Sequence, residues 1–170
     1  MWDISHISRK YVIITIYPIY ERLFIVICTF FGHRAIPKNI ENELQIVLID
    51  LIKNKDVNLF YVGNNGDFDA LVRKELNLLK STFPHINYYV VLAYMPKENN
   101  ILNTYNFSDT IYPDELEFTP PKYAIDKRNR WMLNKSDYVV TYVKTTFGGA
   151  YKFKKLAEKK GKTVINLADK

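Results

Sequence analysis

Apolar runs and helix-period patterns alternate along most of the chain. The near-continuous apolar runs, which predict buried β-strands, lie at residues 23–31, 57–62, 86–94, 137–143 and 163–167. The segments with apolar residues at helical spacing, which predict amphipathic helices, are 39–53, 67–82, 122–134 and 149–160. Buried strands that alternate with helices are typical of βαβ units around a parallel sheet. We therefore expect an α/β fold with a Rossmann-like open parallel sheet of about five strands and helices on both faces.

The first 22 residues do not fit this alternation. Residues 11–20 are apolar and follow two basic residues, as in a signal peptide, but Pro18 interrupts the run and no small-residue cleavage site follows. A bilayer span takes about 20 apolar residues, which this run does not reach. We expect residues 1–22 to be a leader or an extra strand, with a membrane anchor as the less favoured alternative, and residues 23–170 to form a single domain.

Composition narrows the class of protein. A length of 170 residues suits one domain. The single cysteine, Cys28, excludes an intrachain disulfide and a zinc site of several cysteines, and it favours a cytoplasmic location. No residue set suggests a metal site or a Ser/His/Asp triad. The net charge of +6 favours anionic partners such as phosphates, but the charge is too dispersed to indicate nucleic acid by itself.

Glycines gather where three of the predicted strands end. These loops are Gly32-His33-Arg34, Gly63-Asn64-Asn65-Gly66-Asp67 and Gly148-Gly149. Ligands of open α/β sheets bind beyond the carboxyl ends of the strands, and the N–H groups of a following helix suit phosphate. The glycines either make simple strand-to-helix turns or admit a phosphate-bearing ligand, and their number favours the ligand. Asp67 can cap the helix that follows it.

Two common nucleotide-binding motifs are absent. The chain has no GxGxxG after the first predicted strand and no P-loop pattern ending in Gly-Lys-Ser/Thr. An ordinary dinucleotide dehydrogenase or NTPase is therefore disfavoured.

The segment 96–119 is polar, contains proline and shows no clear period, which predicts a functional loop such as a lid. Its Glu115 and Glu117 are either acid/base groups or solvated loop charge. The predicted helix 122–134 places Arg128 on its apolar face, where a guanidinium needs an anionic or carbonyl partner. That partner is either a carboxylate such as Asp137 or a ligand phosphate.

Three further features allow two interpretations each. His33 either contacts a phosphate or acts as a base, or else it stabilises the turn in which it lies. Asn129 can share either role of its neighbour Arg128, while Asp126 and Arg130 are expected to form an exposed ion pair. The lysines of segment 149–162 form a solvated face or, alternatively, a contact for nucleic acid or an acidic partner.

Four ordered motifs resemble the bacterial SLOG superfamily, which groups Rossmann-like domains related to the DNA-processing protein DprA and to the LOG enzymes. The motifs are residues 28–34 (CTFFGHR), 63–69 (GNNGDFD), 124–132 (AIDKRNRWM), and Lys135-Ser136-Asp137 followed by Gly148-Gly149-Ala150. The later motifs also resemble the YpsA-like branch. The resemblance covers about residues 24–167.

The resemblance implies binding of a nucleotide or a derivative such as NAD or ADP-ribose. It implies that Gly32, His33 and Arg34 line the phosphate side, that the motif at 63–67 forms a second wall, and that Gly148-Gly149 closes a third. LOG-type enzymes carry the signature Pro-Gly-Gly-x-Gly-Thr-x-x-Glu, whereas residues 146–153 here read TFGGAYKF. The Gly-Thr step and the catalytic glutamate are missing, so phosphoribohydrolase activity has no signature here.

Three functions follow from these features. The favoured one is a cytoplasmic nucleotide-binding or nucleotide-sensing domain, with no cofactor established beyond this ligand and homo-oligomerisation left open. The first alternative is a hydrolase of an N-glycosidic or phosphate bond, with candidate groups Asp67, Asp69, Glu115, Glu117 and His33. The second alternative is a nucleic-acid or protein-interaction domain. The candidate ligand-binding residues are Gly32, His33, Arg34, Gly63, Asn64, Gly66, Asp67, Arg128, Asn129, Gly148 and Gly149.

Overall fold

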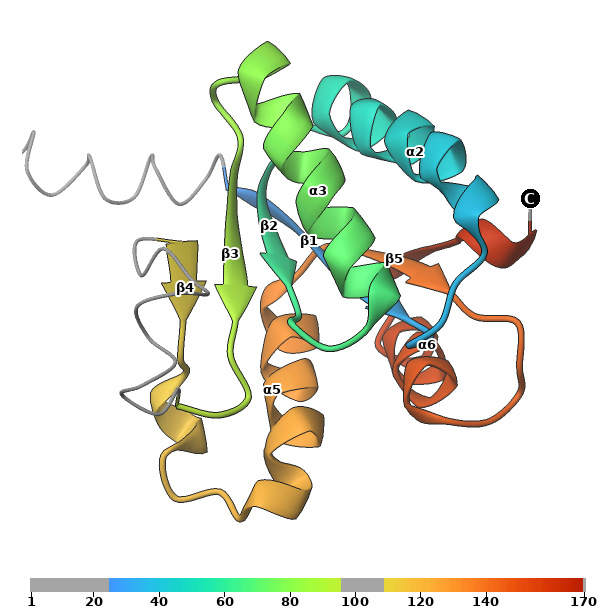
Figure 1. Cartoon of the computed structure of the whole chain (residues 1–170). Helices are drawn as coiled ribbons and strands as arrows, with labels where there is room; N and C mark the ends of the chain where they lie inside the picture. Colours follow the sequence, from blue (N-terminus) through green and yellow to red (C-terminus); the bar gives the residue numbers. More distant parts are fainter. Residues whose placement is uncertain (1–24, 96–108, 170) are drawn as a thin grey trace, which may run out of the picture.

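Six parallel strands form one open sheet in the order β4-β3-β2-β1-β5-β6 (Figure 1). The computed structural model describes residues 25–95 and 109–169. The strands are β1 (Val26–Gly32), β2 (Val57–Val62), β3 (Asn87–Val91), β4 (Thr110–Ile111), β5 (Tyr138–Tyr142) and β6 (Thr163–Asn166). The Rossmann-like α/β class with an open parallel sheet is confirmed. The sixth strand, β4, has two residues and lies inside the segment expected to be irregular.

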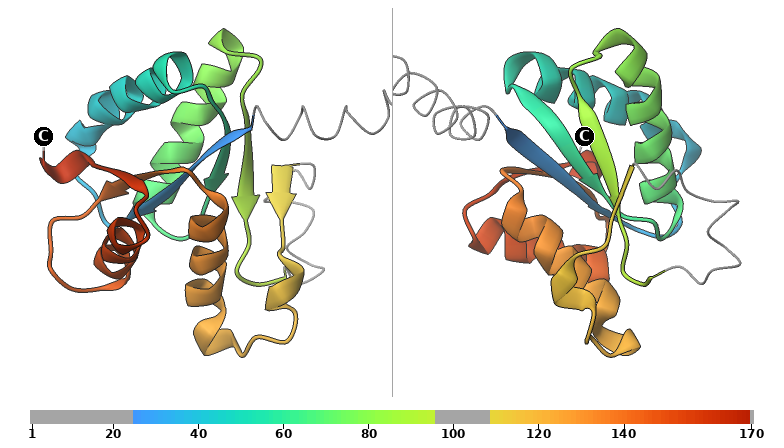
Figure 2. Two further views of the ribbon diagram at one scale, coloured as in Figure 1. Left: turned by 180° about the vertical axis from the view of Figure 1, so that it is seen from behind. Right: turned by 90° about the vertical axis from the view of Figure 1, so that its left-hand side faces the viewer.

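Within the described residues, four helices cover the two faces of the sheet. They are α2 (Glu41–Asn54), α3 (Asp67–Thr82), α5 (Pro121–Lys135) and α6 (Gly149–Lys159). Short 3-10 segments precede α2 and α5, namely η2 (Lys38–Ile40) and η4 (Asp114–Leu116), and η5 (Leu167–Asp169) follows β6. The right-hand view of Figure 2 shows α2 and α3 on one side of the sheet and α5 and α6 on the other. This three-layer arrangement is what apolar strands between amphipathic helices predict.

The core is divided by the sheet into two apolar clusters. Successive strand residues point to opposite faces, so Phe30 joins the cluster under α2 and α3, while Phe31 joins the cluster under α5 and α6. The ring of Phe30 stacks on Phe60, and the ring of Phe31 stacks on Phe153 of α6. Because both faces are covered, each strand needs apolar residues at consecutive positions, which explains the unbroken apolar runs in the sequence.

The strand order reverses at β1. From β1 the chain runs outward through β2, β3 and β4, and it then returns to the other side of β1 with β5 and β6. The loop after β1 therefore leads to α2 on one face of the sheet, and the loop after β5 leads to α6 on the other face (Figure 2). In open α/β sheets such a switch point opens the crevice that holds the ligand.

The structure contradicts one expectation from the sequence and does not cover two others. Helix α3 begins at Asp67, with Gly66 as its N-cap residue and no side-chain capping hydrogen bond, so the expected capping role of Asp67 is wrong. The Asp67 N–H instead donates to Arg34 O at 2.7 Å, which ties the second glycine loop to the first. The leader over 1–22 and residues 96–108 of the expected lid lie outside the described residues.

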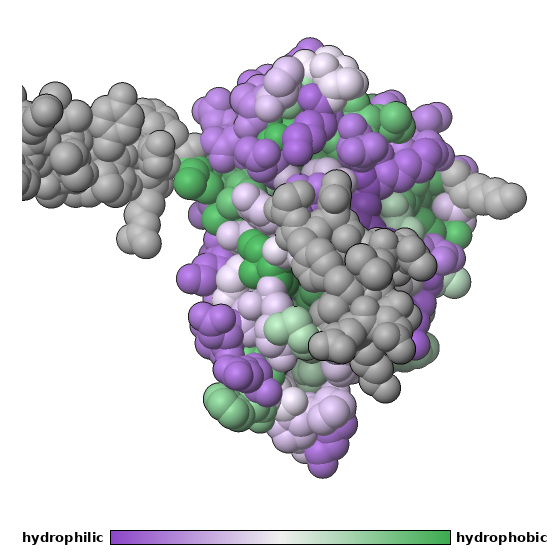
Figure 3. Space-filling view, turned by 60° about the vertical axis from the view of Figure 1, so that its left-hand side comes forward, coloured by the Kyte–Doolittle hydropathy of each residue, from purple (hydrophilic) through white to green (hydrophobic). Residues whose placement is uncertain are grey.

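The surface of the described residues is mainly hydrophilic in the view of Figure 3, with apolar side chains in small groups. Large apolar side chains that stand free include Phe118 and Phe147, each in a loop. Within residues 25–95 and 109–169, no helix has the length and apolar character needed to cross a membrane.

Candidate functional site

A cavity of about 340 Å³ lies at the carboxyl end of β1, at the switch point of the sheet. Four parts of the chain line it: the end of β1 and the next residues (Phe30–Arg34), the β2–α3 connection and first turn of α3 (Gly63, Asn65, Asp69), α5 (Ile125, Arg128, Asn129, Met132) and the start of α6 (Gly149, Ala150). The fold therefore brings together segments separated by more than a hundred positions in the sequence.

Most of the predicted ligand-binding residues line this cavity. They are Gly32, His33, Arg34, Gly63, Arg128, Asn129 and Gly149. The remaining predicted residues, Asn64, Gly66, Asp67 and Gly148, neighbour the lining residues in the chain without being part of the lining. Among the candidate acid/base groups, Asp69 and His33 line the cavity. Glu115 borders a separate surface hollow beside Trp131, and Glu117 is exposed in the connection before α5.

The sequence interpretation missed several lining residues. Ile125 and Met132 share a face of α5 with Arg128 at helical spacing, so the same periodicity that singled out Arg128 could have placed them. Asn65 lies in the predicted loop 63–67, where the sequence argument considered mainly the glycines. Ala150 lies in the first turn of α6, where only the three-dimensional arrangement shows that it faces the cavity.

The guanidinium of Arg128 is buried at the cavity wall, with 2% of the residue exposed. Its Nη1 donates to the backbone oxygen of Val91 at 2.6 Å, and its Nε donates to Asn129 Oδ1 at 2.8 Å. Nη1 and Nη2 also reach the side-chain oxygens of Asn64 at 3.4 Å and Asn65 at 3.2 Å. The structure therefore supplies uncharged oxygens as the partners of this cation.

Asp137, offered from the sequence as a carboxylate partner for Arg128, has a different role. Its Oδ2 accepts the N–H of Ile27 at 2.9 Å, near the beginning of β1 and thus at the opposite edge of the sheet. That expectation is wrong because Asp137 precedes β5, whereas Arg128 lies level with the strand ends. Burial lowers the pKa of Arg128, and the nearby carboxylate of Asp69 opposes this effect.

Asp69 is the acidic group of the cavity and is 8% exposed. Its Oδ2 accepts the backbone N–H of Asn65 at 2.9 Å. Burial raises the pKa of Asp69, while the Asn65 hydrogen bond and the charge of Arg128 act in the opposite direction. Within the described part of the chain no ion pair joins Asp69 to Arg128, so the two charges act on each other across a gap.

Gly63 explains how both charged groups fit at the same place. A β-carbon at this position would lie 2.2 Å from Asp69 Oδ2 and 3.0 Å from Arg128 Nη1. Gly32 has a similar steric role, since a β-carbon there would lie 2.2 Å from the ring of Phe68. At these two positions the absence of a side chain makes room for groups of the protein itself. The sequence analysis considered simple turns and access for a ligand, and it did not consider this third reason for glycine.

The beginning of α6 is open, in contrast to the other glycine loops. Gly148 caps the helix with φ 91°, and β-carbons placed on Gly148 or Gly149 would meet nothing within 4 Å. No side chain caps α6 and no acidic residue lies in its first turn. The unpaired N–H groups at such a helix end carry partial positive charge and suit an anion.

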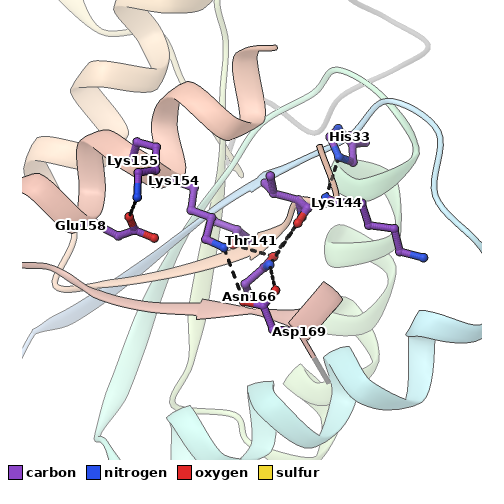
Figure 4. A network of polar contacts seen from close by, with 9 residues as sticks. His33, Thr141, Lys144, Lys154, Lys155, Glu158, Asn166 and Asp169 are labelled. Atoms are coloured by element: carbon purple, nitrogen blue, oxygen red, sulfur yellow. Dashed lines mark hydrogen bonds and ion pairs between the residues drawn. The ribbon is translucent and has the colours of Figure 1, made fainter. Parts of the chain in front are cut away.

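His33 is held in the turn that follows β1. Its Nε2 accepts the N–H of Lys144 at 3.0 Å, and its own backbone N–H donates to Tyr142 O at 3.3 Å (Figure 4). With Nε2 as an acceptor, the proton of a neutral imidazole resides on Nδ1. The turn-stabilising role is thus present, and it occupies the Nε2 lone pair, which is the lone pair that proton abstraction by this neutral imidazole would need.

The loop that carries Lys144 is fixed from the side of β6 by Asn166. Its buried amide oxygen accepts from Thr141 Oγ1 at 3.1 Å and from Val143 N at 2.9 Å, and Nδ2 donates to Val143 O at 3.1 Å (Figure 4). Nδ2 also donates to Asp169 Oδ1 at 2.7 Å. Asn166 therefore continues the sheet hydrogen bonding past the end of β5 and supports the contact with His33.

An exposed charge cluster connects the two helices that border the cavity. Asp126 of α5 accepts from Arg130 Nε at 2.7 Å, which confirms the expected pair, and also from Lys152 of α6. Exposed pairs of this kind contribute about 0–1 kcal/mol. In residues 25–95 and 109–169 no group of three or more His, Cys, Asp or Glu side chains could hold a metal ion.

The sheet order, with helices on both faces and a cavity at the switch point, defines a Rossmann-like α/β domain. Two solved structures share this fold. DNA processing protein A (DprA) from Streptococcus pneumoniae aligns with a TM-score of 0.58 at 16% identity, over 82% of this chain and 49% of that chain. DprA from Helicobacter pylori, described with a unique single-stranded DNA binding mode, aligns with a TM-score of 0.55 at 16% identity, over 82% of this chain and 63% of that one.

These alignments show a DprA-like fold and leave part of each DprA chain without a counterpart, since the present chain spans 49% and 63% of them. No family model matches the sequence, and no curated protein matches it.

Proposed function

We propose that the cavity binds a phosphate-bearing nucleotide or nucleotide derivative. The observation that carries the proposal is the cavity at the β1/β5 switch point, bordered by the uncapped beginning of α6 and by the buried Arg128. The helix beginning offers N–H donors and Arg34 offers an exposed cation, which together suit the charge and oxygen atoms of a phosphate.

The dimensions and polarity of the cavity agree with such a ligand. Small-molecule sites measure about 300–1,000 Å³ and combine apolar walls with a few polar groups. Here Phe31, Ile125 and Met132 supply apolar wall, and Asp69 and Asn129 supply polar groups. The motif resemblance to the SLOG superfamily and its YpsA-like branch supports the same ligand class, with NAD and ADP-ribose among the molecules to test.

The test is thermal unfolding of the full chain against NAD, ADP-ribose, AMP and cyclic nucleotides. A ligand at about 100 times its Kd adds about 2.7 kcal/mol of stability, which for this size is a shift of about 5–10 °C. Arg34→Ala removes an exposed guanidinium from the lining and should weaken the shift. Arg130→Ala is the matched control, because it removes an exposed guanidinium that lies outside the lining.

A shift that is reduced by Arg34→Ala and kept by Arg130→Ala supports the proposal. Absence of a shift with every nucleotide would reject it. Analysis of the same incubations for cleavage products tests the hydrolase alternative, for which Asp69 and His33 are the candidates that line the cavity.

Single-stranded DNA is the second candidate ligand, and the fold similarity to H. pylori DprA favours it. The net charge of +6 and the lysines of α6 would add non-specific attraction to phosphates. Fluorescence anisotropy with an oligonucleotide of about 16 nucleotides tests this candidate. Affinity that falls steeply with salt concentration supports it, and no binding at low salt excludes it.

A further inference from the structure

The carboxylate of Asp69 uses little of its hydrogen-bonding capacity. An ionised carboxylate has two oxygens with about four lone-pair sites. The structure gives it one hydrogen bond, from the N–H of Asn65, although the residue is more than nine-tenths buried and lines the cavity. A buried charge of this kind is costly unless donors surround it. The cavity is therefore where its missing donors would come from.

The chemistry of the neighbouring groups restricts which donors suit Asp69. The guanidinium of Arg128 lies close by, since the position of a Gly63 β-carbon is within 3.0 Å of Arg128 Nη1 and 2.2 Å of Asp69 Oδ2. A cationic donor would be repelled by that guanidinium, and a phosphate oxygen would be repelled by Asp69 itself. Neutral hydroxyl groups fit both neighbours, because they donate to the carboxylate without adding charge.

We propose that Asp69 accepts hydrogen bonds from the sugar hydroxyls of the bound nucleotide, so that the cavity selects ribonucleotides over 2′-deoxyribonucleotides. This inference rests on the proposed function and specifies the class of ligand. The phosphate of the same ligand is placed at the beginning of α6, where Gly149 and Ala150 line the cavity and no acidic residue lies in the first turn. The cavity thus separates a hydroxyl-binding end from a phosphate-binding end.

The experiment compares the four ribonucleoside 5′-monophosphates with their 2′-deoxy counterparts, each titrated separately into the full chain and followed by thermal unfolding. A hydrogen bond to a charged group contributes enough to change Kd by about 10- to 100-fold. We expect the preferred ribonucleotide to bind at least about tenfold more tightly than its 2′-deoxy form.

Asp69→Asn is the decisive variant, because it keeps the size and one oxygen acceptor and removes the charge. Neutral hydrogen bonds are about half as strong, so the preference should fall by about five- to tenfold. Asp50→Asn is the matched control: it makes the same exchange on α2, a helix that contributes nothing to the cavity lining, and should keep the preference. Unfolding of each variant without ligand verifies that it is folded.

Three results would overturn the inference. Equal binding of ribo- and deoxyribonucleotides by the wild-type chain would refute recognition of the 2′-hydroxyl, and with it the proposed selectivity, while leaving nucleotide binding intact. An unchanged preference for ribonucleotides in a folded Asp69→Asn variant would show that another residue recognises the hydroxyl groups. Binding of neither series would reject this inference, and the proposed function would be rejected with it if NAD, ADP-ribose and the cyclic nucleotides also gave no shift. The wild-type comparison decides the matter even if Asp69→Asn fails to fold.

Discussion

Replacing Arg128 with methionine tests whether the two buried charges of the cavity support each other. Methionine keeps much of the length and apolar volume of the side chain and removes every donor. The backbone oxygen of Val91, now bonded at 2.6 Å, would lose a charged donor in a buried position. An unpaired buried acceptor costs about 1–3 kcal/mol. Asp69 would at the same time lose its nearest favourable charge, which opposes the effect of burial on its pKa.

The expected loss of stability is about 3 kcal/mol at pH 7. Removing one partner of a directly bonded buried pair costs about 3–5 kcal/mol, and here the charges are not in direct contact, so the lower end of that range applies. Part of the cost arises from the carboxylate that remains. The effect of Asp69→Asn should therefore be about 1–2 kcal/mol more favourable in the Arg128→Met background than in the wild-type chain.

Urea denaturation of the wild-type chain, the two single variants and the double variant gives the interaction energy as a double-mutant cycle. Arg130→Met serves as the control, since its ion pair with Asp126 is exposed and should contribute less than about 1 kcal/mol. An interaction energy below about 0.5 kcal/mol between positions 69 and 128 would show that the two charges are independent, and it would refute the electrostatic account of the cavity.

Two further predictions concern stability outside the cavity. The side chain of Glu75 is 1% exposed, and burial, followed by the neighbouring carboxyl group of Glu41, raises its pKa. Because an acid with a raised folded-state pKa loses stabilisation as pH rises from its ordinary pKa of about 4.3 through the raised one, Glu75→Gln should gain stability relative to wild type over that window. If the free energies of unfolding of Glu75→Gln and of the wild-type chain, measured by urea denaturation, change with pH in parallel, this prediction is wrong. Asn166→Ala should lower the free energy of unfolding by about 2–4 kcal/mol, because it leaves the N–H and C=O of Val143 unpaired. A loss below about 1 kcal/mol in the same assay would show that the Asn166 hydrogen bonds do not stabilise the end of β5.

The sequence predicts the sheet well because both of its faces are covered. Adjacent residues such as Phe30 and Phe31 are both buried, each in a different cluster. A strand of this kind is therefore visible in the sequence as an unbroken apolar run. The short strand β4 gave no such signal. Two residues, Thr110 and Ile111, carry too little pattern to separate a strand from a loop, and their pairing with β3 depends on the whole sheet being in place.

The candidate site is predictable in its location and much less in its contacts. Helical spacing places Arg128 inward, because its neighbours on that face are apolar. The acceptor it finds at Val91 lies 37 positions earlier in the chain and is a backbone oxygen, which no side-chain pattern reveals. The carboxylate of Asp69 was visible as a candidate group. Its burial beside Arg128 follows from the steric space at Gly63, and that space depends on how α3 and α5 pack across the strand ends.

Two of the helices that begin at this edge, α3 and α6, differ in the charge of their first turns. Helix α3 has Asp67 and Asp69 in its first turn, and α6 has no acidic residue there. Carboxylates at a helix beginning neutralise its partial positive charge, whereas a first turn without acidic residues retains it. An anion entering the cavity is therefore directed to α6, while α3 offers an acceptor for neutral donors. This charge asymmetry follows directly from the sequence once the fold shows that both helices begin at the same edge, and it is the physical basis for expecting a ligand with a phosphate at one end and hydroxyl groups at the other.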